Sequence, residues 1–285
     1  MFAKKICCIS FLILFFVAGL AAQDLKLEEV FAKHLASIGN EEKRKQLNNM
    51  MLLGYSEFQS KLPQRKSSGK VAIVSDSTNL LFISSFLSEN YPYEKIGIFG
   101  GKINVPFVSS GIRSPLGDFL WEHPSLLESG LFAGSMSLKW SLLDENFKKS
   151  KNQLVGTKKI DGKKMYVVEH YPRGSSEEFK IRLFFDAETF QHVRSEYREE
   201  FTGKAPAFPG SRPGISETFG RVNGYLIQLT EIFGEFQTYE GITLPSLSKV
   251  QYMGSSSKGT FEYDWIFRVN EVKFNQTLKE NFFTF

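Results

Sequence analysis

The sequence predicts a mainly β chain of the α+β class, in which antiparallel strands dominate and a few helices accompany them. Three observations lead to this fold class. From about Met51 onward apolar residues recur at every second position, the spacing of a half-buried strand. Asp161-Gly162 separates two such segments, and this dipeptide favours the tight turn of a β-hairpin. Residues 115–145 interrupt the alternation with a mostly helical pattern.

The first 23 residues have the features of a secretory signal peptide. Lys4 and Lys5 form a basic start, residues 6–20 are apolar, and small residues before and at Ala22 suit signal peptidase. We therefore expect cleavage after Ala22 or a neighbouring residue, and export to the periplasm of a Gram-negative bacterium. The alternative is an uncleaved anchor, but the apolar stretch is shorter than the roughly 20 residues that span a bilayer.

The remaining residues, 24–285, are expected to form a single β-domain, since β-domains of up to about 250 residues are common. A boundary near residues 146–151 is the alternative. Both cysteines, Cys7 and Cys8, lie in the signal, so the mature chain has no thiol for a disulfide or a metal. The formal net charge is only +4, which argues against nucleic acid as a partner.

A helix is expected at residues 27–38, where an apolar stripe recurs at helical spacing and Gly39 can end the helix. Asn40 can cap a second, short and polar helix on the surface. In the middle of the chain, Pro115 can open a helix that Pro124 ends. Turns are expected at 67–69, 76–78 and 186–189, and a loop is expected at 202–213. Strands are expected at 54–59, 70–75, 79–86, 93–99, 154–160, 164–170, 179–185, 192–198, 225–236, 243–253 and 261–272.

No recognisable catalytic motif is present. The four histidines, His34, His123, His170 and His192, have no metal-site spacing, and no serine completes Gly-x-Ser-x-Gly. His34 lies on the apolar stripe of the first helix and is expected to be a hydrogen-bonded core residue, whereas His192 alternates with charged residues and is expected to be solvated. The lysines at 158–164 are interpreted as a solvated turn, with contact to an anionic membrane as the alternative.

Two late strands have strongly apolar faces. The chain contains 28 phenylalanines, enough for a large core or an apolar cavity. A sheet with such a face must bury it against helices, another sheet or an apolar ligand. We expect these side chains to bind the ligand: Phe179, Ile181, Leu183, Phe185, Phe261, Tyr263, Trp265 and Phe267.

Three local segments, together with the order of elements, resemble the outer-membrane lipoprotein carriers, the LolA/LolB-like superfamily. The segments are 30–39 (VFAKHLASIG), 162–169 (GKKMYVVE) and 182–190 (RLFFDAETF). The resemblance implies a curved antiparallel half-open barrel with helices covering the open side. It also implies a periplasmic carrier that binds a lipid or lipoprotein acyl chains in the apolar concavity, and not an enzyme.

The expected function is therefore a monomeric binding or carrier protein for a hydrophobic ligand, with no cofactor and no metal. A transient membrane or envelope-protein partner is possible for such a carrier. One alternative is a structural or interaction module whose aromatic face is a filled core. Another is a hydrolase in which His123, His170 or His192 meets a serine or a carboxylate in a cleft.

Overall fold

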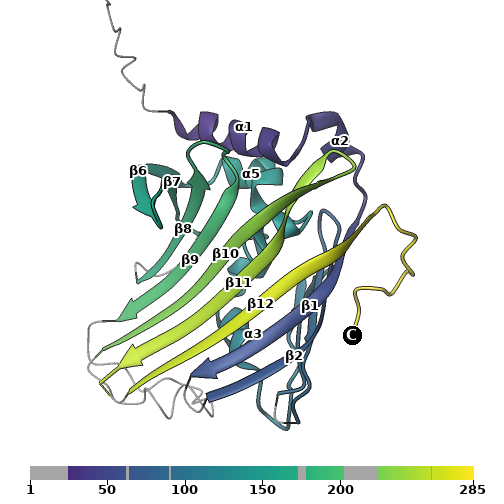
Figure 1. Ribbon diagram of the computed structural model, residues 1–285, viewed down its shortest axis with the longest axis vertical. Coiled ribbons are helices and arrows are strands. Elements are labelled where there is room, and N and C mark those ends of the chain that lie inside the picture. Colours follow the sequence, from purple (N-terminus) through teal and green to yellow (C-terminus); the bar gives the residue numbers. More distant parts are fainter. Residues whose placement is uncertain (1–24, 62–63, 90, 173–177, 202–223, 258) are drawn as a thin grey trace, which may run out of the picture.

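The computed structural model describes residues 25–61, 64–89, 91–172, 178–201, 224–257 and 259–285. Within these residues the chain forms one antiparallel sheet of twelve strands (Figure 1). The strand order is β5-β4-β3-β2-β1-β12-β11-β10-β9-β8-β7-β6, so the described strands leave β5 and β6 as open edges. The predicted class, an antiparallel half-open sheet with helices, is confirmed. The strands are β1 (Met50–Lys61), β2 (Gln64–Ser75), β3 (Leu80–Ser85), β4 (Tyr93–Phe99), β5 (Lys102–Asn104), β6 (Asn152–Ile160), β7 (Lys163–His170), β8 (Phe179–Asp186), β9 (His192–Phe201), β10 (Tyr225–Tyr239), β11 (Ile242–Ser256) and β12 (Gly259–Phe274).

Helices gather on one face of this sheet and at one of its ends. Figure 1 shows α1 lying across the ends of the strands, with α5 next to it and α3 behind the sheet. The predicted first helix, its polar successor and the helical insert are all present. Their bounds are α1 (Leu27–Ile38), α2 (Glu41–Lys45), α3 (Pro115–Glu122), α4 (Ser125–Glu128) and α5 (Glu145–Lys148), with 3₁₀ turns at η1 (Gly134–Met136) and η2 (Ser141–Leu143).

The corner between α1 and α2 follows directly from its residues. Gly39 ends α1, and a Cβ at this position would lie 2.7 Å from the carbonyl oxygen of Gly241. Only glycine therefore allows the corner to pack so closely on the β10–β11 turn. The Asn40 side chain accepts a hydrogen bond from the Lys43 backbone N–H at 2.8 Å, which caps α2.

The two predicted hairpin turns of the second β half are confirmed. Asp161 and Gly162 both have positive φ, at 49° and 83°, as a type I′ turn requires. At the next turn, Asp186 Oδ1 accepts backbone hydrogen bonds from Glu188 and Thr189, each at 2.9 Å. These bonds lower the pKa of the Asp186 carboxyl, although burial opposes them.

The turn predicted at residues 67–69 is wrong. These residues lie within β2, where Ser67 pairs with Phe58 and Ser68 with Glu57 on β1. Glycine is required at position 69 because two backbones approach closely there. A Cβ on this residue would lie 1.9 Å from the carbonyl oxygen of Ser85. Small residues thus indicated a contact between strands and not a reversal of the chain.

The main core lies between the helices and the inner face of the sheet. It contains Val30 of α1, Leu120 of α3 and inward side chains of nearly every strand. Two smaller apolar clusters lie apart from it. One joins the C-terminal Phe283 to Val74 and Leu81, and the other joins Met165, Val167 and Phe184. The sheet is therefore covered continuously on one face and only locally elsewhere.

Two predictions fall outside the described residues, namely the signal peptide at residues 1–23 and the loop at 202–213. In the part of the chain that the structure describes, no helix combines the length and the apolar character needed to cross a membrane.

Candidate functional site

The eight side chains predicted to bind a ligand lie in the main core. Six of them are at most 8% exposed: Phe179, Ile181, Leu183, Phe185, Trp265 and Phe267. Phe261 and Tyr263 are half-buried against the same cluster. Their two strands, β8 and β12, are separated by three others, so the two groups lie roughly 19 Å apart across the sheet. The structure therefore places them in one core but not in one patch.

Rings from the helices and from other strands fill the space in front of these side chains. Phe185 meets the ring of Phe31 on α1, with ring centroids 6.2 Å apart. Phe267 meets Phe82 at 5.1 Å, and Trp265 donates a hydrogen bond from Nε1 to the Tyr91 hydroxyl at 2.8 Å. Ligand contact by the eight residues stays a prediction, which would require this packing to open.

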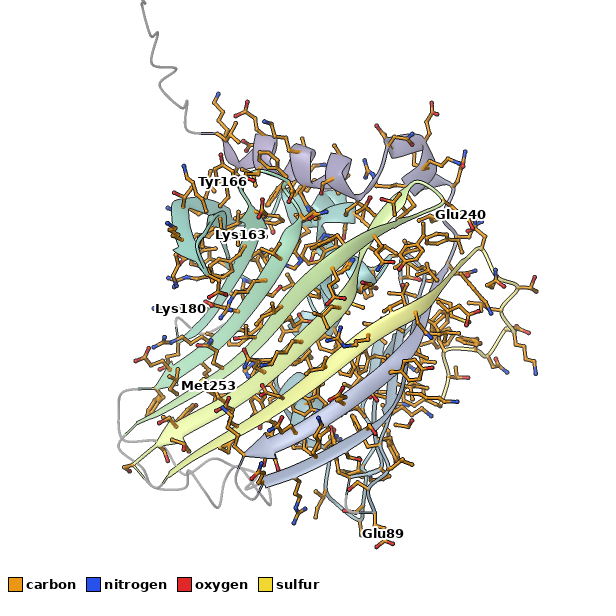
Figure 2. The ribbon with its side chains drawn as sticks, in the orientation of Figure 1. Glu89, Lys163, Tyr166, Lys180, Glu240 and Met253 are labelled. Atoms are coloured by element: carbon orange, nitrogen blue, oxygen red, sulfur yellow. The ribbon has the colours of Figure 1, made fainter. Side chains whose placement is uncertain are left out.

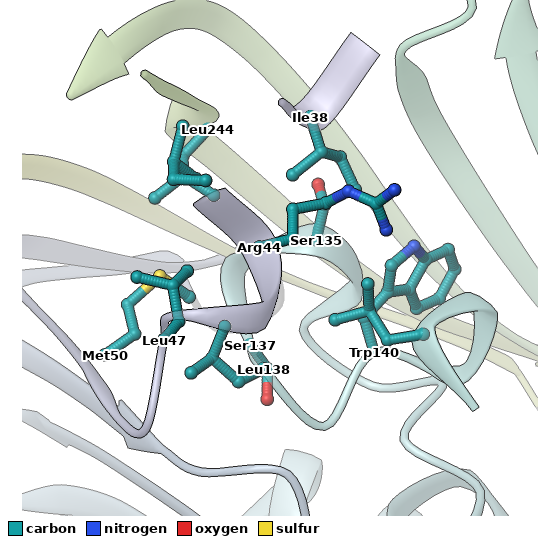
Figure 3. Close-up of a pocket in the computed structure, with 11 residues that line it drawn as sticks. Ile38, Arg44, Leu47, Met50, Ser135, Ser137, Leu138, Trp140 and Leu244 are labelled. Carbon is teal, nitrogen blue, oxygen red and sulfur yellow. The ribbon is translucent and has the colours of Figure 1, made fainter. Parts of the chain in front are cut away.

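A pocket opens instead at the corner where α1, α2 and the helical insert meet β11 (Figure 3). Its volume is about 20 Å³, room for about one water molecule. Most of its wall is apolar. The lining residues are Ile38, Arg44, Leu47, Met50, Ser135, Ser137, Leu138, Trp140, Leu143, Ile242 and Leu244.

Ser135 gives this pocket a polar group without a partner. Its side chain is buried, and its hydroxyl has no hydrogen bond to any of the residues that the structure describes. The local backbone explains this position, because Ala133 and Gly134, which open the η1 turn, both have positive φ, at 69° and 48°. A buried unpaired hydroxyl is costly, so a water or a ligand atom would be favoured beside it.

Arg44 brings a positive charge to the same pocket. Figure 3 shows its side chain reaching across the pocket between Ile38 and Trp140. Its Nε donates a hydrogen bond to the Gly39 carbonyl oxygen at 3.0 Å. Burial lowers the pKa of this guanidinium, and Glu41 opposes that effect. Among the described residues no carboxylate lies within ion-pair distance of Arg44, so its charge is available to an anionic group.

A hydrogen-bonded histidine supports the Trp140 wall of the pocket. Trp140 Nε1 donates to His34 Nε2 at 2.9 Å, which leaves His34 Nδ1–H to donate to the Phe190 carbonyl oxygen at 3.0 Å. Burial lowers the pKa of His34 to about 4. The prediction that His34 is a hydrogen-bonded core residue is confirmed.

The prediction that His192 is solvated is wrong, because its side chain is 0% exposed. A register shift between Phe184 and Phe185 places His192 directly opposite Phe185, on the inner face of the sheet. Its ring stacks on Trp140 with centroids 4.6 Å apart. The prediction assumed strict alternation along the strand and so placed His192 on the same face as Arg194. The bulge breaks this alternation and turns His192 to the inner face.

The histidines of the hydrolase alternative lie at three separate places. His123 Nε2 is 3.5 Å from Glu199 Oε2, and His170 Nδ1 is 2.8 Å from Asn152 Oδ1. Within the described segments only His192 of these three histidines contacts a serine, with Nε2 at 3.0 Å from Ser195 Oγ. Both members of that pair are 0% exposed, so a substrate carbonyl cannot reach them in this conformation. Within the described residues no group of three or more histidine, cysteine, aspartate or glutamate side chains could hold a metal ion.

The sequence did not reveal this pocket. Arg44 lies in a run of charged residues that predicted only a solvated helix, and Ser135 lies in an insert with no clear period. The single available signal was the Gly39-Asn40 break, which fixes the corner where the pocket forms.

No protein-family model matches the chain, and no curated protein matches it either. Similar solved structures exist. A LolA superfamily protein from Nitrosomonas europaea is 15% identical, with 91% of this chain and 98% of that chain covered and a TM-score of 0.43. A DUF1329 family protein from Desulfovibrio piger is 10% identical, with coverages of 90% and 96% and a TM-score of 0.40. The Mycobacterium tuberculosis lipoprotein LppX is 11% identical, with 71% of this chain and 93% of that chain covered and a TM-score of 0.25.

One of these similar structures is described as a LolA superfamily protein, and the three segments named in the sequence analysis resemble the same superfamily.

Proposed function

We propose that this protein binds a hydrophobic ligand, a lipid or a lipoprotein acyl chain, between its helical layer and the inner face of its sheet. The ligand enters at the corner between α1 and α2. Its apolar chain lies against Leu138 and Leu244, and Arg44 binds an acidic group at the head of the chain. The protein would act as a carrier and not as an enzyme.

The observation that carries this proposal is the pocket at the corner, where an apolar wall surrounds the guanidinium of Arg44 and the Ser135 hydroxyl, which has no partner among the described residues. Such a combination suits an amphiphile, because an apolar chain gains from burial and an acidic head gains from the guanidinium. At about 20 Å³ the pocket does not hold a chain as it stands. Binding therefore requires the corner to open, and α2 can move cheaply because none of its residues is buried.

The experiment measures binding of a fluorescent fatty acid to delipidated protein, with native mass spectrometry of protein purified from its own periplasm. A Leu138→Trp variant fills the pocket from a half-buried position and should weaken binding at least tenfold. Leu87→Trp makes the same change at a side chain that is 88% exposed and should bind like the wild type. A bare protein mass together with no binding of the fluorescent fatty acid would contradict the proposal.

A second function is favoured by the packing of the eight side chains predicted to bind the ligand. Because six of the eight are buried against other side chains, the protein could be an interaction module of the cell envelope with a filled core. This function predicts a protein partner in pull-downs and no retained lipid. The Leu138→Trp variant would then keep its partner and its fold.

We also propose that the protein is exported to the periplasm as a single domain of residues 24–285. The basic and apolar character of residues 1–23 supports this location. The mass of the protein from a periplasmic fraction should correspond to a chain that begins at Gln23 or a neighbouring residue. A mass that includes Met1 would contradict export by signal cleavage.

A further inference from the structure

The positive charge of this protein is concentrated in one segment of twenty residues. Residues 145–164 contain seven lysines and two acidic residues, a net charge of +5. The whole chain has 35 basic and 31 acidic residues, so the rest has 28 and 29, a net charge of −1. The weak overall charge therefore conceals one strongly basic surface. The seven lysines, named here the basic hairpin surface, are Lys148, Lys149, Lys151, Lys158, Lys159, Lys163 and Lys164.

Most of these lysines are exposed and unpaired. Of the seven, only Lys148 is half-buried, and it lies 2.6 Å from Glu145. No other member has a carboxylate within ion-pair distance among the described residues. A solvated face of ordinary composition would have similar numbers of both charges, whereas here seven lysines outnumber the acidic groups among and beside them, which are Glu145, Asp161, Asp186 and Glu188.

The hairpin also keeps a repulsive pair. Lys159 and Lys164 are directly opposite each other in the β6–β7 pairing. Like charges in such a pair destabilise a sheet, so the two lysines lower the stability of this hairpin. Lysines on an edge strand can also serve to prevent pairing with another sheet, and β6 is an edge of the described sheet. One or two lysines suffice for that purpose, and the surface continues through α5, which belongs to no strand.

The basic hairpin surface lies at the same end of the molecule as the pocket. Figure 1 shows β6 and β7 beside α1, and Figure 2 shows Lys163 and Tyr166 at that end, with Glu89 at the opposite end. The hydrogen bond from Lys45 is the main cause that lowers the pKa of Glu41 on α2, and the charges of Arg44 and of Lys148 on α5 add to it, so α5 lies near α2. The basic surface thus extends from the hairpin tip to the α1–α2 corner.

From these observations we infer that the basic hairpin surface docks the protein on the anionic headgroups of a lipid bilayer. Residues 145–164 contain no arginine, so every basic side chain in this segment is a lysine. A lysine is a flexible point charge that suits the diffuse field of a charged surface, whereas arginine provides the bidentate geometry of a specific protein contact. Apolar groups for the headgroup region lie among the lysines, since Val155 is 44% exposed and Tyr171 is 36% exposed.

The test is co-sedimentation of the full mature protein with vesicles of phosphatidylcholine alone and with vesicles that also contain phosphatidylglycerol. The wild type should bind only the anionic vesicles, and high salt should release it. A Lys159→Gln, Lys163→Gln, Lys164→Gln triple variant should bind them on the order of 100-fold more weakly, at about fivefold per lysine. A control triple variant removes the same charge at exposed lysines elsewhere, Lys70→Gln, Lys102→Gln and Lys279→Gln, and should bind like the wild type.

Three outcomes would overturn the inference. They are equal binding of the wild type to both kinds of vesicle, equal loss in the two triple variants, and binding to soluble polyglutamate without binding to the anionic vesicles. Unchanged circular dichroism and thermal unfolding of the hairpin variant show that it has folded. The result does not depend on the proposed ligand, since delipidated protein that binds no fatty acid can still bind these vesicles.

Discussion

At the scale of single residues, Arg44 gives the pocket a positive charge, and Ser135 gives it a buried hydroxyl that has no hydrogen-bond partner among the described residues. An Arg44→Met variant keeps most of the apolar length of the side chain and removes the charge. If Arg44 binds an acidic headgroup, the affinity for a fluorescent fatty acid should fall roughly tenfold or more, because a hydrogen bond to a charged group contributes about 1.5–3 kcal/mol. The affinity for the matching fatty alcohol should not change.

Lys45→Met is the matched control for this change. Lys45 neighbours Arg44, is exposed and pairs with Glu41 at 2.6 Å, outside the pocket. Its replacement should leave both affinities as they are. Equal loss of acid and alcohol binding in the Arg44 variant would show that the arginine supports the pocket wall and does not recognise the headgroup.

Ser135 tests the pocket without any ligand. Its hydroxyl is buried and has no partner in the described part of the chain, so its removal from bulk water lowers the stability of the ligand-free protein. A Ser135→Ala variant should therefore gain about 1 kcal/mol in free energy of unfolding, measured by urea denaturation. A loss of stability would instead indicate that an ordered water in the pocket satisfies the hydroxyl.

At the scale of elements, the close contact between β2 and β3 depends on Gly69. A Cβ at this position would lie 1.9 Å from the Ser85 carbonyl oxygen, and backbone cannot move aside as a side chain can. Gly69→Ala should therefore lower the free energy of unfolding by about 2–3 kcal/mol, the cost of forced overpacking. Urea denaturation monitored by far-ultraviolet circular dichroism measures this change.

Gly234 on β10 provides the control within the same sheet. A Cβ there would meet nothing within 4 Å, and its φ is not positive. Gly234→Ala should be neutral or should stabilise the protein by up to about 1 kcal/mol, since alanine restricts the unfolded chain. Equal effects of the two substitutions would show that the approach of β2 to β3 is not as close as the structure has it.

Elements specified by neighbouring residues could be predicted from the sequence. The stripe of α1, the cap at Asn40 and the Asp161-Gly162 turn each depend on a few consecutive side chains. Features that depend on a distant strand could not be predicted from the sequence. Gly69 faces a carbonyl group from β3, and His192 changes face because of a bulge in its pairing with β8.

At the scale of the whole molecule, the same limit applies to the order of the strands and to the pocket. Met50 pairs with Phe274, a partner from the other end of the chain, and no periodicity specifies that choice. The pocket needs α2, η1 and β11 to meet, so its residues share no pattern in the sequence. The apolar faces of β8 and β12 were predicted correctly as faces, but only the packed structure shows that side chains of α1, β3 and the segment around Tyr91 fill the space in front of them.

Buried ionisable groups across the whole molecule give its stability two opposed dependences on pH. Burial lowers the pKa values of His34 and His170 to about 4, below the ordinary value of 6.5. Their contribution to the free energy of unfolding is therefore complete above pH 6.5 and is lost as the pH falls toward 4. Burial raises the pKa values of Glu94 and Glu231 to about 7, above the ordinary 4.5. Their contribution is complete below 4.5 and is lost as the pH rises to 7.

A Glu231→Gln variant should separate these two dependences. Tyr197 and the Ala133 N–H both donate hydrogen bonds to the Glu231 carboxyl, at 2.8 and 2.9 Å, and glutamine keeps an acceptor there without a charge. The stability of the variant relative to the wild type should therefore rise by about 3 kcal/mol between pH 4.5 and pH 7, at about 1.4 kcal/mol for each pKa unit. Urea denaturation across this range measures the change, with Glu28→Gln at an exposed position as the control. A difference that stays constant with pH would mean that Glu231 remains ionised in the folded core, held by the hydrogen bonds that it accepts.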